Sequence, residues 1–150
     1  LEADAVWQVT PDWRLFSAFS YIKSELTQLK AEAIELVSVG SALPLTPKFQ
    51  GNLRSQYSWQ LGEYWLDWHF AWVYSASSWS SIVAEQREKQ DSYQIMNTSI
   101  NLDLNNWQLQ IYLDNLADER AKLFINDQDD IKRVTVNRPR TLGIKLKYRY

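Results

Sequence analysis

The side chains that could do chemistry in this sequence are few and scattered. His69 is the single histidine, and the chain has no cysteine. Because a metal site needs three or four converging ligands, we expect His69 to be polar lining beside Asp67 rather than a metal ligand. No nucleophile, general base and oxyanion site can be assembled from the other residues. The sequence therefore predicts no enzyme, no cofactor and no metal site.

Carboxylates gather in one late segment of the chain. Asp127, Asp129 and Asp130 are spaced loosely like a calcium-binding loop, but the glycine and the closing glutamate of that motif are missing. We therefore expect a solvated loop at this position. The net charge of -2 also argues against nucleic-acid binding, since a nucleic-acid-binding surface is basic and clustered.

The elements that carry these residues follow one pattern, the alternation of apolar and polar residues that is typical of a strand with one apolar face. The last segment shows it most clearly. One of its faces carries Leu142, Ile144, Leu146, Tyr148 and Tyr150, and the other carries Thr141, Gly143, Lys145, Lys147 and Arg149. Similar segments cover residues 1–9, 13–25, 52–61, 66–74, 96–104 and 107–114. The sequence predicts an all-β, antiparallel fold of about seven strands.

The connections between these segments alternate between short and long. The short ones are the turns Thr10-Pro11-Asp12, Leu61-Gly62-Glu63 and Asn105-Asn106, and the long ones cover residues 26–47, 75–91 and 117–137. We expect residues 26–37 to be a loop with at most a helical turn. Outer-membrane barrels have short turns on the periplasmic side and long outer loops. The alternation therefore favours a segment of a transmembrane β-barrel.

Aromatic residues support a membrane barrel, since the chain holds eight Trp, eight Tyr and five Phe. Many cluster beside the short turns, where an interfacial girdle is expected. They are Trp7, Trp13, Trp59, Tyr64, Trp65 and Trp107, and Tyr148 and Tyr150 join them if the chain ends on that side. The apolar face is expected to contact lipid. Lys145, Lys147 and Arg149 are expected to face the lumen with Asp103 and Asp114, because a charge at the bilayer midplane costs about 2–4 kcal/mol.

Several segments resemble TonB-dependent receptors. Asn137-Arg138-Pro139-Arg140-Thr141-Leu142-Gly143, followed by Tyr148-Arg149-Tyr150, resembles the closing strand of this family. Tyr112-Leu113-Asp114-Asn115-Leu116-Ala117-Asp118-Glu119-Arg120 is similar to its penultimate strand and the start of its last loop. Residues 43–49 resemble the beginning of a downward strand, and residues 1–12 an upstream hairpin. Two positions depart from the family pattern, where Phe is commoner than Tyr150 and an aromatic residue is commoner than Ala117.

The resemblance implies a barrel of about 22 strands, closed by an N-terminal plug. Such receptors import iron-siderophores, cobalamin or glycans with energy from an inner-membrane TonB complex. Residues 1–150 would then be the C-terminal portion of the barrel domain without its plug, in the outer membrane of a Gram-negative bacterium. We expect such a fragment to need its missing strands. The transported ligand and the loop residues that bind it are not predicted.

The resemblance to outer-membrane proteins also implies a role for the last strand. Ile144, Leu146, Tyr148 and Tyr150 would form the signal that the barrel-assembly machinery recognises. Two alternatives stay open for the whole chain. One is a passive outer-membrane pore or structural barrel. The other is a soluble, lipocalin-like carrier, in which Trp68, Phe70 and Trp72 would form the core. Trp79, in the second long connection, is a candidate for stacking against a ligand.

Overall fold

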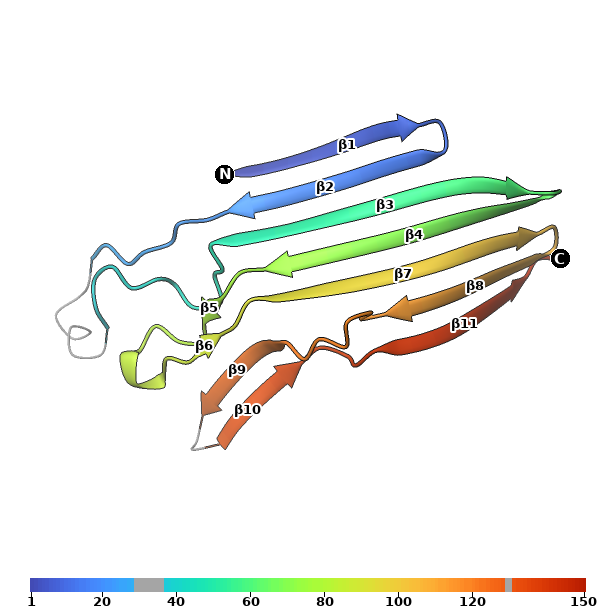
Figure 1. Cartoon of the computed structure of the whole chain (residues 1–150). Helices are drawn as coiled ribbons and strands as arrows, with labels where there is room; N and C mark the ends of the chain where they lie inside the picture. Colours follow the sequence, from blue (N-terminus) through green and yellow to red (C-terminus); the bar gives the residue numbers. More distant parts are fainter. Residues whose placement is uncertain (29–36, 129–130) are drawn as a thin grey trace.

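The computed structural model describes residues 1–28, 37–128 and 131–150. Its main feature is one antiparallel sheet of seven strands in the order β1-β2-β3-β4-β7-β8-β11 (Figure 1). These strands are β1 (Glu2–Thr10), β2 (Trp13–Tyr21), β3 (Phe49–Leu61), β4 (Tyr64–Ser75), β7 (Tyr93–Leu104), β8 (Trp107–Asp114) and β11 (Thr141–Tyr148). The predicted all-β, antiparallel fold is confirmed. Strands β2 and β11 end earlier than the alternation predicted, and Tyr150 lies outside β11.

The register of the sheet follows the alternation of the sequence. Ile144 of β11 lies opposite Ile111 of β8, and Ile111 lies opposite Ile100 of β7. Apolar residues therefore meet apolar residues from strand to strand. Because successive side chains point to opposite faces, a slip by one residue would move a whole strand's apolar set to the other face. The separation of faces thus excludes every slip by an odd number of residues.

Three tight turns join β1 to β2, β3 to β4 and β7 to β8, and they lie at the end of the sheet where the C-terminus also lies (Figure 1). Gly62 and Asn105 adopt positive φ angles of 63° and 53° in two of these turns. Glycine and asparagine adopt that conformation at the lowest cost. The three predicted short connections are therefore confirmed as hairpin turns.

The long connections lie at the opposite end, and two of them contain strands that the alternation missed. These are β5 (Ser78–Trp79), β6 (Lys89–Gln90), β9 (Lys122–Gln128) and β10 (Ile131–Val136), with the 3₁₀ turn η2 (Ala84–Gln86) between β5 and β6. Strands β5 and β6 are too short for an alternation to be visible. The acidic run hid the second hairpin, although the β-branched residues near Val136 favour a strand.

The last long connection differs from its prediction. Asp127 lies in strand β9, so the expectation of a loop at that residue is wrong. The physical reason is that residues 122–128 pair with residues 131–136 as a hairpin, and backbone pairing outweighs the local acidity. Asp129, Asp130 and residues 29–36 lie outside the described residues.

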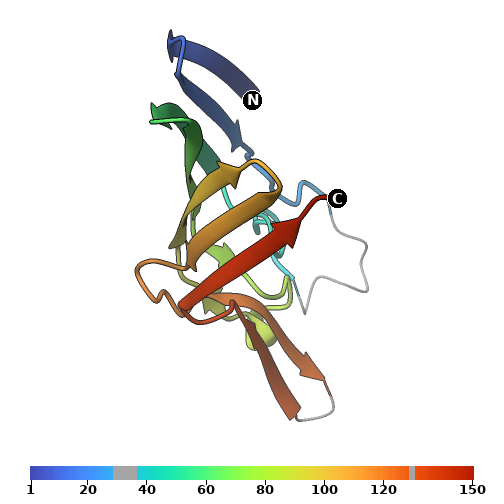
Figure 2. The ribbon, with the colours of Figure 1, turned by 90° about the vertical axis from the view of Figure 1, so that its right-hand side faces the viewer.

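The main sheet forms a single layer, and Figure 2 shows it twisted, with the β9–β10 hairpin projecting from one end. Among the described residues, the only buried hydrophobic side chains are Ala121 and Ile125. Leu142, Ile144 and Leu146 are 72%, 69% and 62% exposed. A sheet in a water-soluble domain buries one face against a second layer, and this sheet has no such layer in the described chain. No helix in the described part is long and apolar enough to cross a membrane.

Candidate functional site

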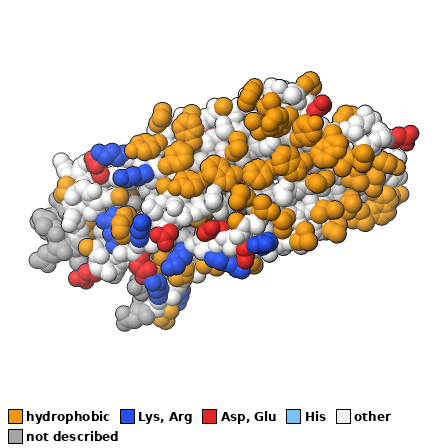
Figure 3. All heavy atoms as spheres, in the orientation of Figure 1, with side chains coloured by type: hydrophobic (Ala, Val, Ile, Leu, Met, Phe, Trp, Pro, Cys, Tyr) orange, Lys and Arg blue, Asp and Glu red, His pale blue; other side chains and the backbone are white. Residues whose placement is uncertain are grey.

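The candidate site is the sheet itself, which has two chemically distinct faces. The apolar face fills the near side of the molecule in Figure 3, where hydrophobic side chains form a continuous band over the strands. Its central members are Leu53, Tyr57, Trp59, Leu66, Trp68, Phe70, Trp72, Tyr74, Met96, Ile100, Leu102, Leu104, Leu109, Ile111, Leu113, Leu142, Ile144, Leu146 and Tyr148. Among the paired residues of the main sheet, no Lys, Arg, Asp or Glu lies on this face.

Some polar residues do lie on the apolar face, and three of them accept hydrogen bonds from tryptophan. The indole N–H groups donate at N···O distances of 2.9, 2.9 and 3.0 Å in the pairs Trp13–Ser55, Trp68–Thr98 and Trp72–Gln94. The Thr98 hydroxyl in turn donates to the carbonyl oxygen of His69 at 3.1 Å. An unpaired N–H in an apolar environment costs several kcal/mol. These pairs therefore let tryptophan lie on an apolar face with its polar atom satisfied.

The polar face is formed by the residues that alternate with the apolar set, and it is hollowed. A cavity of about 370 Å³ extends across it from β2 to β11 and is lined by Arg54, His69, Ser99, Tyr112, Asp114 and Lys145, among others. His69 lies opposite Gln56 and Ser99, so its predicted place among polar lining residues is confirmed. No group of three potential metal ligands occurs among the described residues.

The charged residues of the polar face lie as expected on one side of the sheet, but they do not pair across the strands. Lys145 is opposite Gln110, and Lys147 is opposite Gln108. Asp103 accepts a hydrogen bond from Gln108 at 3.2 Å. The Lys145 ammonium lies 4.9 Å from the centre of the Tyr112 ring. The charged side chains of the described polar face therefore contact amide, hydroxyl and aromatic groups rather than opposite charges.

The C-terminus meets the aromatic residues at the tight-turn end. Tyr148 packs on Trp107 with ring centres 4.7 Å apart, and Tyr150 meets Tyr148 edge-on at 5.6 Å. The backbone N–H of Arg149 donates to the carbonyl oxygen of Asn106 at 2.8 Å. The predicted level of Tyr148 and Tyr150 beside the short turns is therefore confirmed. Ile144, Leu146 and Tyr148 lie on the apolar face of β11, and Tyr150 continues beyond its end.

At the other end of β8, a buried asparagine organises the start of the last long connection. Asn115 is only 3% exposed and has a positive φ of 53°. Its side-chain amide donates to the carbonyl oxygens of Glu119 and Arg138, both at 2.9 Å, and its Oδ1 accepts the Glu119 N–H at 2.9 Å. One asparagine thus joins the chain leaving β8 to the chain returning to β11.

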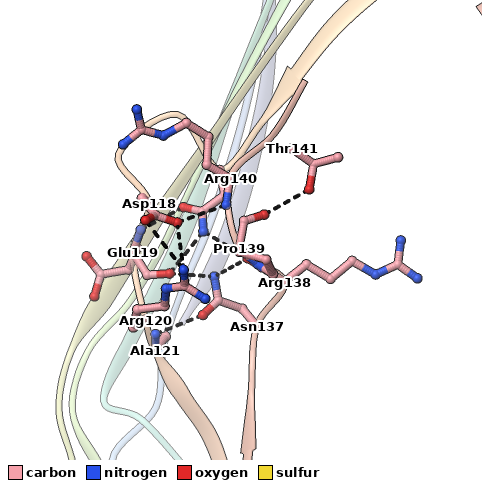
Figure 4. Close-up of polar contacts among 10 residues, drawn as sticks. Asp118, Glu119, Arg120, Ala121, Asn137, Arg138, Pro139, Arg140 and Thr141 are labelled. Carbon is pink, nitrogen blue, oxygen red and sulfur yellow. Dashed lines mark hydrogen bonds and ion pairs between the residues drawn. The ribbon is translucent and has the colours of Figure 1, made fainter. Parts of the chain in front are cut away.

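Two further side chains complete this junction (Figure 4). Asn137 Oδ1 accepts the Ala121 N–H at 2.8 Å. Asp118 Oδ1 accepts the Arg140 N–H at 2.9 Å, and Asp118 also forms an ion pair with Arg120 at 3.3 Å. The hydrogen bond from Arg140, with the charges of Arg120 and Arg140, lowers the pKa of Asp118 below its usual value of 3.8. Asn115, Asp118 and Asn137, which lie in the motifs at residues 112–120 and 137–143, thus hold this junction together. Sequence reasoning missed the roles of Asn115 and Asn137.

The three long connections also contact one another. The Leu45 N–H donates to the Trp79 carbonyl oxygen at 2.8 Å, which joins the first connection to the second. Lys132 and Glu88 form an ion pair at 2.6 Å, which joins the second to the third. The Arg87 guanidinium lies 4.2 Å from the centre of the Trp79 ring. One face of Trp79, the expected stacking residue, is therefore occupied by a side chain of its own loop.

A family model described as "TonB dependent receptor-like, beta-barrel" matches residues 1–116. No curated protein matches the chain.

Solved structures resemble the chain over nearly its whole length. The ferric yersiniabactin uptake receptor FyuA from Yersinia pestis has 17% identity and a TM-score of 0.82, with 98% of this chain and 22% of that chain covered. The siderophore receptor PiuA from Acinetobacter baumannii has 21% identity and a TM-score of 0.79, with 99% and 21% covered. The closed form of the ferric-catecholate import receptor Fiu from E. coli K12 has 21% identity and a TM-score of 0.77, with 98% and 20% covered.

These likenesses concern the fold, since all three identities are low. The chain spans about a fifth of the length of each of these solved proteins. The seven-stranded sheet therefore corresponds to one sector of a larger barrel in each of them.

Proposed function

The chain belongs to the family of TonB-dependent receptor-like β-barrels, and on that premise we propose that it forms part of the wall of an outer-membrane receptor-transporter. The observation that carries the proposal is the separation of the two faces. Charged residues of the paired main sheet lie on the hollowed polar face, and the apolar face carries none. A barrel wall between lipid and a water-filled lumen requires this arrangement.

A membrane location also explains why the apolar face lacks a cover. Acyl chains supply the apolar environment that a second protein layer would supply in a soluble carrier. Trp68 and Trp72 are only partly buried and pair with polar neighbours on their own face, so they do not behave as the core of a lipocalin-like fold. Strands β1 and β11 each pair with one strand of the described chain. Unpaired strand edges are not tolerated in lipid, so further strands close the barrel.

We place residues 1–150 in the C-terminal portion of the barrel domain, in the outer membrane of a Gram-negative bacterium. The plug and the TonB complex are the partners of the whole receptor. The barrel-assembly machinery is the partner of the last strand, through Ile144, Leu146, Tyr148 and Tyr150. The fully exposed Tyr150 and the uncovered apolar face of β11 support this role. The function that we propose for the protein is that of a receptor and transporter rather than that of an enzyme.

We propose an iron-siderophore as the ligand class to test first, because PiuA is named a siderophore receptor, FyuA a ferric yersiniabactin uptake receptor and Fiu a ferric-catecholate import receptor. Cobalamin and glycans are the other classes. The long connections contact one another through Trp79 and Glu88. They supply the surface that an arriving ligand would meet, since loops on a rigid barrel carry specificity.

Uptake by whole cells tests the proposal. Cells that make the full-length protein would receive labelled ferric siderophores, cobalamin or oligosaccharide, with the proton-motive force intact or collapsed by an uncoupler. We expect saturable uptake of one class that stops when the force collapses. Uptake that is not saturable and continues without the force would instead identify a passive pore. Recovery of the protein in the soluble fraction without detergent would exclude a membrane barrel altogether.

A further inference from the structure

Gly143 of β11 lies directly opposite Tyr112 of β8 on the polar face. A Cβ atom built on Gly143 would overlap the ring carbon Cζ and the hydroxyl oxygen of Tyr112. The Tyr112 side chain therefore lies across the backbone of β11, in the space that any other residue would fill with its side chain. The φ of Gly143 is not positive, so the glycine serves close approach and not an unusual backbone conformation.

The pairing of β11 with β8 needs a local determinant of register. In the hairpins of the main sheet, a tight turn determines which residues face each other. Strands β8 and β11 are instead joined by residues 115–140, whose length does not set the register, although the hydrogen bonds from Asn115 to Arg138 and from Arg140 to Asp118 hold the two ends of this connection together. The alternation of faces excludes slips by one residue. Slips by two residues keep Leu146 and Ile144 on the apolar face, so the alternation does not exclude them.

We propose that Tyr112 and Gly143 form a register lock, which allows the last strand to pair with β8 in one alignment only. A slip by two residues would place Thr141 or Lys145 opposite Tyr112, and either side chain would occupy the place of the ring. In the native register Lys145 instead lies over the ring at 4.9 Å. The lock concerns pairing within the sheet and holds whatever the barrel transports.

Cysteine cross-linking in the full-length protein tests the lock, since this chain has no cysteine of its own. Gln108 faces Lys147 on the polar face in the native register. The pair Q108C/K147C therefore reports the native register, and Q108C/K145C reports the slip by two residues that places Thr141 opposite Tyr112. We expect the native pair to cross-link and the slipped pair not to. When Gly143→Ala is added to the native pair, the yield of the native cross-link should fall several-fold. When Tyr112→Ala is added to the slipped pair without Gly143→Ala, the slipped cross-link should become detectable.

The double variant Y112A/G143A separates the lock from a simple loss of folding. Removal of the ring frees the space for a Cβ, so the native cross-link should return to its level in Y112A alone. Gly51→Ala is the matched control, because a Cβ there meets Phe49 at 3.5 Å, an ordinary contact. Three results would each overturn the proposal: G143A behaves like G51A, the double variant stays at the level of G143A, or Y112A yields neither cross-link.

Discussion

At the scale of single residues, the hydroxyl groups on the apolar face have a definite role. Ser55 and Thr98 interrupt an apolar pattern and would weaken a prediction of lipid contact if sequence alone were considered. Both accept a hydrogen bond from a tryptophan on a neighbouring strand. They are therefore part of what makes a tryptophan-rich face compatible with hydrocarbon, where water cannot satisfy the indole N–H.

We expect Thr98→Val to destabilise the folded barrel by about 1 kcal/mol, because Trp68 loses its acceptor while the volume at position 98 stays almost constant. Urea unfolding in lipid vesicles, followed by heat-modifiable mobility on gels, measures the change. A double-mutant cycle with Trp68→Phe isolates the pair. If T98V costs the same with Trp68 present and absent, the hydrogen bond contributes nothing.

The hydrogen bond from the Arg140 amide to Asp118 is expected to depend on pH. The Asp118 carboxyl has a lowered pKa in the folded state, so its contribution to stability is present above the usual value of 3.8 and is lost as the pH falls below that value through the lowered folded pKa. Hydrogen exchange should show a protected Arg140 amide at neutral pH that loses protection in that acidic range. In Asp118→Ala the Arg140 amide should be unprotected at every pH.

The Ala121 amide is the internal control for this measurement. Its acceptor is the uncharged amide oxygen of Asn137, which does not titrate. Its protection, expressed relative to the intrinsic exchange rate at each pH, should stay constant. Parallel loss of protection at both amides would show that the whole junction opens and that Asp118 is not the titrating group.

At the scale of elements, β11 combines three features in eight residues. Its apolar face is highly exposed, its polar face contains Gly143, and its end packs against the β7–β8 turn through Tyr148 and Trp107. The strand is held at both ends, by the Asn115 junction at one and by the aromatic contacts at the other. An edge strand that is aligned in this way is a suitable template for the next strand of a barrel.

We expect deletion of Tyr150 to lower the amount of assembled protein in the outer membrane several-fold, because it removes the aromatic end of the strand that is proposed to be recognised during assembly. Tyr150→Phe keeps the ring and should assemble at the normal level. Heat-modifiable mobility in outer-membrane fractions measures both. Equal surface levels for the deletion and the parent protein would remove Tyr150 from the assembly signal.

At the scale of the whole molecule, the proposed barrel wall has lipid on its apolar face and water on its polar face. Neighbouring residues of one strand therefore differ in whether they tolerate a charged side chain. Ile111 lies on the apolar face in the middle of β8, and Gln110 lies on the hollowed polar face. A charge at the first position would face the bilayer interior, whereas a charge at the second would face water.

We expect Ile111→Lys to destabilise the barrel by about 2–4 kcal/mol and Gln110→Lys to change stability by less than about 0.5 kcal/mol. The two variants introduce the same residue at adjacent positions, so each is the control for the other. Unfolding by urea in lipid vesicles measures both. Greater damage from Gln110→Lys would reverse the assignment of faces and refute the membrane orientation.

The sequence by itself determined the strands of the main sheet, their two faces, the three tight turns and the aromatic end. These features are local, since the period of two, the turn residues and the clustering of aromatics can all be seen within about a dozen neighbouring residues. Even the separation of charges onto one face follows from alternation alone. The prediction of a transmembrane β-barrel rests on these signals and on the resemblance of the last strand to a known family.

Only the tertiary structure decided which residues meet across the strands. The Trp68–Thr98 bond, the contact of Tyr112 with Gly143 and the junction of Asn115 with Arg138 join residues that are far apart in the sequence. Alternation leaves the register between two strands open by multiples of two residues, so it cannot predict such pairs. The β9–β10 hairpin escaped prediction for a related reason, because mutual backbone pairing, rather than an apolar face, makes those residues strands.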